Sequence, residues 1–267
     1  MNITFMRVSM VDYDRNASVP RFGAGLGINT QAQVDQGLRT YMLGVYNNMV
    51  IGLGITGLVA LGLYMVSVTG EGGTLRSGAQ LTELGRFLYM GSFKYVLIFA
   101  PLAVVLYLGF KVHSMSASAA RITFFLYAAL MGASLSMLGL VYAHSSIARV
   151  FFITAAAFGS LSLYGYTTKR DLSGMSSFLM MGLFGLMIGS IVNIFLGSST
   201  MQWIISIVGV LLFAGLTAYD TQNIKEMYYE GDMQETAAKK SILGALQLYM
   251  DFIGMFQFLM SMMGNRE

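Results

Sequence analysis

Seven long apolar segments constrain the fold of this chain more than any other feature of its sequence. Each is close to the roughly 20 residues that an α-helix needs to cross the hydrocarbon core of a bilayer. They lack the alternation of apolar and polar residues that marks lipid-facing β-strands. The sequence therefore predicts an all-α membrane protein, a seven-transmembrane helix bundle. The predicted spans are 41–66, 93–110, 122–142, 150–168, 175–196, 201–220 and 242–263.

The composition agrees with burial in lipid. Hydrophobic residues make up 55% of the 267 residues and charged residues only 11%, against about 25% charged residues in soluble domains. The net charge of +3 is too small and too scattered to indicate a nucleic-acid partner. Cysteine is absent and only two histidines occur, which excludes disulfides, thiolate metal sites and a histidine-rich metal centre. We expect no cofactor.

Polar segments divide the chain into a tail and a membrane domain. We expect residues 1–38 to form a polar cytoplasmic tail and residues 39–264 to contain the seven spans. Short connections make consecutive helices antiparallel neighbours. Within the longer connection 67–92 we expect a surface helix over 79–90.

Lysine and arginine are distributed unequally between the two sides of such a bundle. With the N-terminus in the cytoplasm, eleven of the 16 lie inside and five outside. Because cytoplasmic connections carry an excess of Lys and Arg, we expect a cytoplasmic N-terminus and a C-terminus outside. The inside residues are Arg7, Arg15, Arg21, Arg39, Lys111, Arg121, Lys169, Arg170, Lys225, Lys239 and Lys240, and the outside residues are Arg76, Arg86, Lys94, Arg149 and Arg266.

Small residues recur along several spans. In lipid, small residues let helix backbones approach closely and supply packing contacts. We therefore interpret these positions as helix-packing sites rather than as part of a pore. The clearest groups are Gly52, Gly54, Gly57 and Gly62 in the first span, Ala155, Ala156, Gly159, Ser160 and Ser162 in the fourth, and Gly182, Gly185 and Gly189 in the fifth.

Two carboxylates are the ionisable groups that enter the apolar spans. Asp220 ends the sixth predicted span, and Asp251 lies about nine residues into the seventh, roughly 14 Å deep at about 1.5 Å per residue. A charge at mid-bilayer costs about 2.5–3.5 kcal/mol on insertion scales, so such residues normally face a bundle interior or a wet cavity. The sixth span runs inward and the seventh starts back from the inside. Both acids therefore fall in the cytoplasmic half, where they can meet.

A meeting of the two acids has a definite chemistry. Burial and mutual repulsion disfavour ionisation of both carboxylates at once, so such a pair shares one proton and senses pH. It also offers oxygen ligands, but Ca²⁺ prefers roughly 6–8 oxygens, which favours a transit or gating site over a tight store. Two alternatives stay open: Asp220 as a solvated residue at a helix end, and Asp251 as a lone protonated acid within the bundle. Gln247, one turn before Asp251, suits either interpretation.

Four short stretches, in order along the chain, carry a resemblance to a known family. They are LYAALMGASLS at 126–136, TTKRDLS at 167–173, AYDTQ at 218–222 and LYMDFI at 248–253. With them the sequence resembles the Bax inhibitor-1 family, also called the transmembrane Bax inhibitor motif family, in its bacterial branch. The resemblance runs from about Arg39 to Gly264.

The resemblance implies a bundle with the last helix central and a pH-sensitive calcium leak channel of the bacterial inner membrane. Asp220 and Asp251 match the family's proton-sensing and gating aspartates, and would hold the transported Ca²⁺ transiently. The family also has a basic residue near the second helix that latches to the gate, for which Lys111 and Arg121 are the candidates here. Some bacterial relatives are described as restraining a membrane-anchored protease, which implies an alternative role as a non-transporting regulator.

An intramembrane aspartyl protease is a further hypothesis that the residues disfavour. Two neighbouring carboxylates that share a proton can activate water. However, Asp251 stands in Tyr-Met-Asp-Phe rather than in the Gly-x-Gly-Asp of those proteases, and no Pro-Ala-Leu follows. We therefore expect no enzymatic activity.

Overall fold

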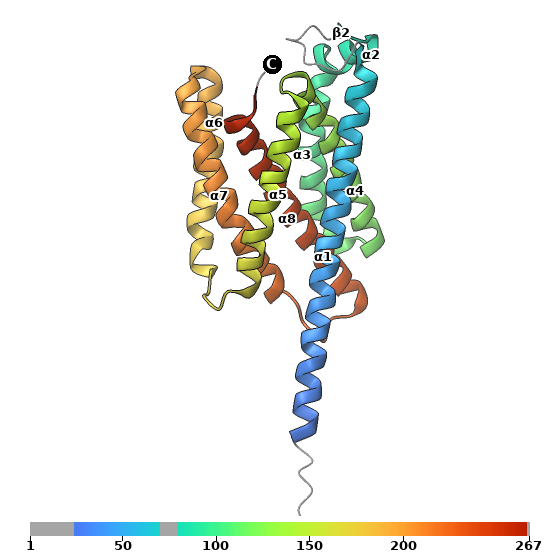
Figure 1. Ribbon diagram of the computed structural model, residues 1–267. Coiled ribbons are helices and arrows are strands. Elements are labelled where there is room, and N and C mark those ends of the chain that lie inside the picture. Colours follow the sequence, from blue (N-terminus) through green and yellow to red (C-terminus); the bar gives the residue numbers. More distant parts are fainter. Residues whose placement is uncertain (1–23, 70–79, 266–267) are drawn as a thin grey trace, which may run out of the picture.

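The computed structural model describes residues 24–69 and 80–265, which form an upright bundle of long helices (Figure 1). Within these ranges seven helices are long and apolar enough to cross a membrane. This confirms the predicted all-α, seven-span fold. The helices are α1 (Ala24–Ser67), α3 (Phe93–Lys111), α4 (Ala117–Leu135, extended by a 3₁₀ turn over Ser136–Leu140), α5 (His144–Thr167), α6 (Ser176–Leu196, after a 3₁₀ turn over Ser173–Met175), α7 (Ser199–Glu226) and α8 (Gln234–Met263).

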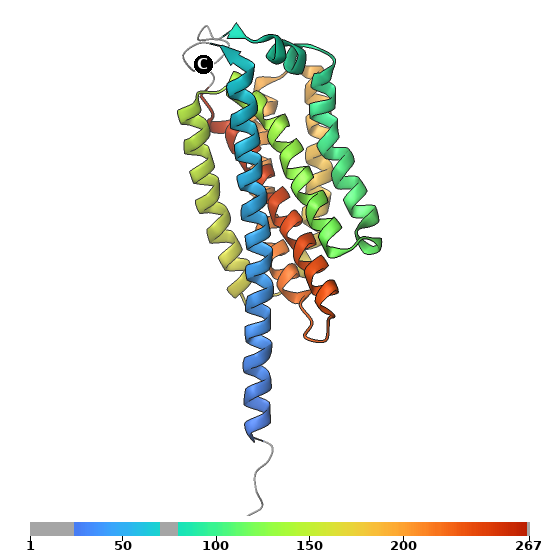
Figure 2. The same ribbon diagram turned by 90° about the vertical axis from the view of Figure 1, so that its right-hand side faces the viewer.

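Consecutive long helices run in opposite directions, so α1 enters the bundle from one end and the C-terminus lies at the other (Figures 1 and 2). α1 begins at Ala24, well before the apolar segment predicted at 41–66, and its first turns extend beyond the other helices. Hydropathy marks the apolar part of a helix and not its polar extension, which explains the difference. The first part of the predicted tail, with Arg7, Arg15 and Arg21, lies outside the described residues.

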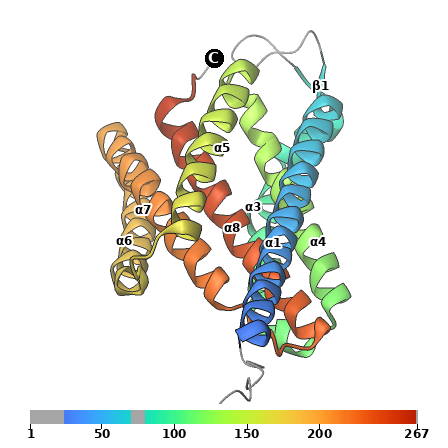
Figure 3. The same cartoon turned by 60° about the horizontal axis from the view of Figure 1, so that its bottom comes forward.

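The last helix is the centre of the bundle. About two-thirds of its apolar window (67%) is buried, against 17–39% for the other six spans. α8 packs against α1, α4, α5 and α7, and Figure 3 shows it between α7 on one side and α1 and α4 on the other. Tyr249, midway along α8, is fully buried, and its ring meets the edges of Phe124 and Tyr127 with centroids 5.6 Å apart.

Backbone pairing joins the described ends of the connection between α1 and α3. Strand β1 (Val68–Thr69) pairs antiparallel with β2 (Gln80–Leu81). Helix α2 (Glu83–Gly85) follows, capped by the Thr82 hydroxyl, and continues as a π-helical turn over Arg86–Met90. The predicted surface helix therefore begins later than residue 79, because residues 80 and 81 pair with β1 instead. Residues 70–79, which include Arg76, lie outside the described part.

The glycine-rich spans do not all pack as expected. A Cβ on Gly52 would lie 2.8 Å from the Phe124 ring, so this glycine does permit a close helix contact. In contrast, a Cβ on Gly54, Gly57 or Gly62 would meet no described atom within 4 Å. On α6, Gly182 faces Leu212, while Gly185 and Gly189 likewise face open space. The packing interpretation is therefore right for Gly52 and Gly182 and wrong for the other glycines in these two groups.

Candidate functional site

The structure brings Asp220 of α7 and Asp251 of α8 together. Their side chains lie within hydrogen-bonding reach of each other, and the Gln247 amide also reaches Asp220. Both acids are nearly inaccessible, with 5% of Asp220 and 4% of Asp251 exposed. One oxygen of Asp251, Oδ2, has no hydrogen-bond partner among the described residues. α8 thus presents an amide and a carboxylate, one turn apart, to a single acid on α7.

Both alternatives left open by the sequence are wrong. Asp220 is not a solvated residue at a helix end, because α7 continues to Glu226 and the side chains of Thr221 and Ile224 are also buried. Asp251 is not a lone acid, because Asp220 lies beside it. The hydropathy boundary near residue 220 marks where polar side chains begin, while the helical backbone continues through them.

The polar end of α7 is held by the loop that follows α5. The Gln222 side chain accepts a hydrogen bond from the Leu172 backbone N–H at 2.7 Å and donates one to the Arg170 carbonyl at 2.9 Å. One turn further along α7, the Lys225 ammonium donates to the Tyr166 carbonyl at 2.9 Å. Two of the four stretches that carry the family resemblance, 167–173 and 218–222, are therefore in direct contact. Gln222 was not identified as a site residue from sequence, because its partners are backbone groups.

Within this loop, Asp171 closes a local turn. Its carboxylate accepts a hydrogen bond from the Ser173 backbone N–H at 2.8 Å. Hydrogen bonds from the Ser173 hydroxyl and from this N–H lower the pKa of Asp171 below its ordinary value of 3.8. The Asp171 carboxyl is therefore ionised at neutral pH.

A chain of hydroxyl groups ends at Thr221, the residue that follows Asp220 on α7. The Tyr46 hydroxyl lies 2.5 Å from the Ser162 hydroxyl, which lies 2.9 Å from the Thr221 hydroxyl. Thr221 in turn donates to the Thr217 carbonyl at 2.7 Å. The chain joins α1, α5 and α7 next to Asp220. No spacing pattern in the sequence identifies it, because its members come from three separate helices.

Neither candidate latch residue reaches the acids. Lys111, in the last turn of α3, and Arg121, in α4, are both exposed. The salt bridges among the described residues join Lys239 to Glu235 and Lys240 to Asp232. The part of the chain that the structure describes therefore sets no cation against the pair, and it holds no cluster of three or more acidic or histidine side chains placed to hold a metal. The pair presents two carboxylates, which suits a shared proton or a weakly held cation.

Comparisons with known proteins agree over nearly the whole chain. Residues 38–267 match the family described as "Inhibitor of apoptosis-promoting Bax1". An uncharacterized protein of Rickettsia prowazekii is 44% identical over 233 residues, covering 87% of this chain and 92% of that one. An uncharacterized protein of Caulobacter vibrioides is 45% identical over 236 residues, covering 88% and 92%. The inner membrane protein YbhL of Escherichia coli K12 is 42% identical over 236 residues, covering 86% and 94%.

Proposed function

The chain belongs to the Bax inhibitor-1 family, and from that premise we propose that it is a pH-sensitive cation leak channel of the bacterial inner membrane. Ca²⁺ is the proposed transported ion, and the gate is the pair of Asp220 and Asp251. The inner-membrane location is supported by the seven apolar helices and by the similarity to YbhL, an inner membrane protein. One observation carries this function: two carboxylates from adjacent helices meet, almost wholly buried, at the densely packed core of the bundle.

A proton held between two such carboxylates is a physical switch. With one proton shared, the acids attract each other through a hydrogen bond and hold α7 against α8. When that proton leaves, two negative charges face each other in a poorly solvated site and repel. A cation drawn into the site relieves this repulsion. The proton and the cation therefore compete for the same oxygens, which links the state of the gate to pH.

The proposed orientation places the N-terminus in the cytoplasm and the C-terminus outside. Among the described residues, the bundle end nearer the N-terminus carries most of the basic side chains, as the positive-inside rule requires of a cytoplasmic face. At that end lie Arg39, Lys111, Arg121, Lys169, Arg170, Lys225, Lys239 and Lys240, and at the opposite end lie Arg86, Lys94 and Arg149. In this orientation the acid pair lies in the cytoplasmic half of the bundle, and cations reach it from that side.

Calcium flux into proteoliposomes tests this function. The variants are Asp220→Asn, Asp251→Asn and the double variant, with Asp171→Asn as the control because Asp171 is an exposed acid in a loop at the same end. We expect each single change to remove most of the pH dependence of flux, and the double variant to resemble the singles, because the two acids titrate as one unit. Wild-type flux and pH dependence in both single variants would exclude the gate.

The second hypothesis is a non-transporting regulator that binds a membrane-anchored protease, and it needs no titrating pair. It predicts that capture of such a protease is unaffected by Asp220→Asn and Asp251→Asn. Absence of flux from the wild-type chain, together with protease capture by both variants, would favour this role over the channel.

A further inference from the structure

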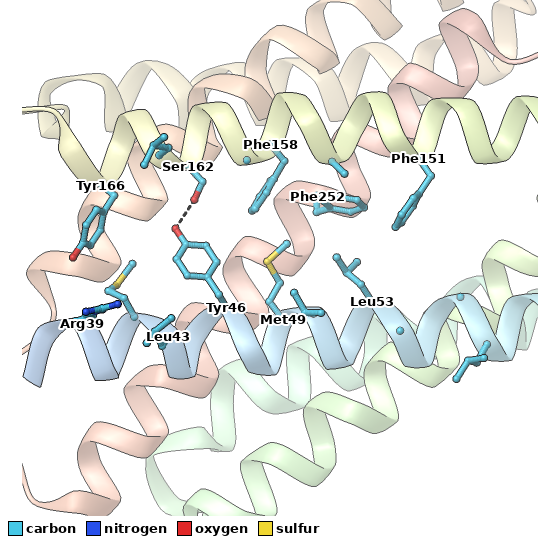
Figure 4. A pocket seen from close by; sticks show the side chains of 18 residues that line it. Arg39, Leu43, Tyr46, Met49, Leu53, Phe151, Phe158, Ser162, Tyr166 and Phe252 are labelled. Carbon is cyan, nitrogen blue, oxygen red and sulfur yellow. Dashed lines mark hydrogen bonds between the residues drawn. The ribbon is translucent and has the colours of Figure 1, made fainter. Parts of the chain in front are cut away.

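A groove of about 1040 Å³ opens along the side of the bundle between α1 and α5 (Figure 4). α1 packs against α4 and α8, and α5 packs against α7 and α8, so the two walls are held apart by the central helix. Phe252 of α8 contributes to the groove between Phe158 and Phe151 of α5. The volume is at the upper end of the roughly 300–1,000 Å³ that is usual for ligand pockets. Because both walls are membrane spans, lipid is the solvent at its open side.

Glycines keep the groove wide. Gly54 and Gly57 on α1 and Gly159 on α5 line it, and a Cβ on any of them would meet no described atom within 4 Å. Small residues in membrane helices normally mark places where backbones touch. Here they face open space, so they leave room along the groove that larger side chains would fill. Such a groove suits a flexible hydrocarbon chain.

One end of the groove is basic. Figure 4 shows Arg39 of α1 facing Tyr166 of α5 across this end. Arg39 is exposed at this end. The Lys225 ammonium of α7 lies 5.2 Å from the centre of the Tyr166 ring but does not itself line the groove. A planar guanidinium pairs well with phosphate oxygens.

Between the basic end and the apolar stretch lies a pair of hydroxyl groups. Tyr46, two turns beyond Arg39 on α1, joins Ser162 of α5 through their hydroxyls at 2.5 Å. Beyond this pair, the lining is apolar as far as Phe151 and Leu58. The order along the groove is therefore cation, hydroxyl pair and hydrocarbon. A glycerophospholipid has the same order of phosphate, ester groups and acyl chain.

We infer that the groove between α1 and α5 is a binding site for an anionic glycerophospholipid of the bilayer. Its phosphate lies at Arg39 and one acyl chain runs past Gly159 and Gly54. Basic pockets between membrane helices on the cytoplasmic side are a known way of holding anionic lipid headgroups. The proposed lipid site does not depend on the proposed ion flux through the acid pair. An experiment that excludes one of these two proposals therefore does not exclude the other.

The test is the lipid that the purified full chain retains, measured by native mass spectrometry after equilibration in nanodiscs of equal phosphatidylglycerol and phosphatidylcholine. Wild type should retain phosphatidylglycerol in preference to phosphatidylcholine. Arg39→Gln should reduce that preference about five-fold, the effect of one basic side chain near a charged membrane surface. Arg121→Gln, an exposed arginine at the same end that does not line the groove, should leave it unchanged.

Filling the groove is the second arm. Gly54→Leu and Gly159→Leu should lower total retained phospholipid at least ten-fold. Gly185→Leu on α6, where a side chain also meets open space outside the groove, should not. Thermal unfolding of each variant shows whether it is folded. If a leucine variant does not fold, Arg39→Gln still tests the site, because Arg39 is on the surface. Each of three results would overturn the proposed lipid site. The first is equal lipid retention by all three leucine variants, and the second is no preference for phosphatidylglycerol in wild type. The third is a co-purified membrane peptide in place of lipid.

Discussion

The Tyr249 hydroxyl at the centre of α8 lies 2.6 Å from the Thr56 hydroxyl of α1. Thr56 also donates to the Ala128 carbonyl of α4, at 2.9 Å. The Thr56 hydroxyl also lies 3.0 Å from the Gly52 carbonyl, one turn earlier on α1. Since these two carbonyls can only accept and the threonine hydroxyl has one proton, Tyr249 is the donor in the first bond. A single polar contact therefore ties the central helix to two of its neighbours within an otherwise apolar layer.

Removing this hydroxyl should loosen the bundle without unfolding it. Tyr249→Phe keeps the ring packing and deletes one hydrogen bond, so we expect a loss of about 0.6–1 kcal/mol in the free energy of unfolding. Thermal unfolding in detergent measures it. Tyr107→Phe is the control, because the Tyr107 side chain is half exposed on the lipid-facing side of α3. Equal effects of the two changes would show that the Tyr249 hydroxyl does not join the helices.

Close approach of α5 to α7 depends on Gly165. A Cβ at this position would collide with the Ala218 carbonyl of the α7 backbone. Gly165→Ala should therefore cost about 1–3 kcal/mol, the usual range for overpacking. Gly185→Ala, whose Cβ meets open space, should be neutral or slightly stabilising because alanine favours helix. Matched unfolding temperatures for the two variants would contradict the close contact.

Gln222 should control the order of the loop between α5 and α6. In Gln222→Leu the Leu172 N–H and the Arg170 carbonyl lose their partner, and a buried unpaired group costs roughly 1–3 kcal/mol. Hydrogen exchange should accelerate in peptides covering 167–173. The control is Gln202→Leu, which breaks hydrogen bonds to Asn193 and Ser261 near the opposite end of the bundle. Faster exchange of 167–173 in both variants would mean a general loosening.

The Asp171 turn has a defined pH dependence. Its pKa is lowered by the Ser173 hydroxyl and backbone N–H, so the folded turn favours the charged carboxylate. The turn should be intact above the ordinary pKa near 3.8 and be lost as the pH falls through the lowered value. Ser173→Ala should raise the pKa of Asp171, measured by NMR titration of the carboxyl carbon. An equal pKa of Asp171 in Ser173→Ala and wild type would show that the Ser173 hydroxyl does not lower it.

Hydropathy was sufficient to predict the fold, because a bilayer requires long apolar helices and few other arrangements satisfy their backbones. It also identified Asp220 and Asp251, since acids within such spans are rare and stand out. It did not find the continuation of α7 to Glu226 or the role of Gln222, because helix continuation and backbone capping leave no mark on apolar content. The groove was missed for a different reason. Glycines that pack and glycines that face open space are identical in a sequence, and only the positions of their neighbours distinguish Gly52 from Gly54.

Gln247 should set the pH at which the proposed gate responds. Its amide reaches Asp220 beside Asp251 and, as a donor, favours the ionised carboxylate over the protonated one. In Gln247→Leu the pair should keep its proton to higher pH. The midpoint of the pH dependence of Ca²⁺ flux should therefore move upward. Gln202→Leu, an amide lost near the other end of the bundle, should leave the midpoint in place. A downward shift in Gln247→Leu would mean that this amide favours the protonated pair, and an unchanged midpoint would separate Gln247 from the gate.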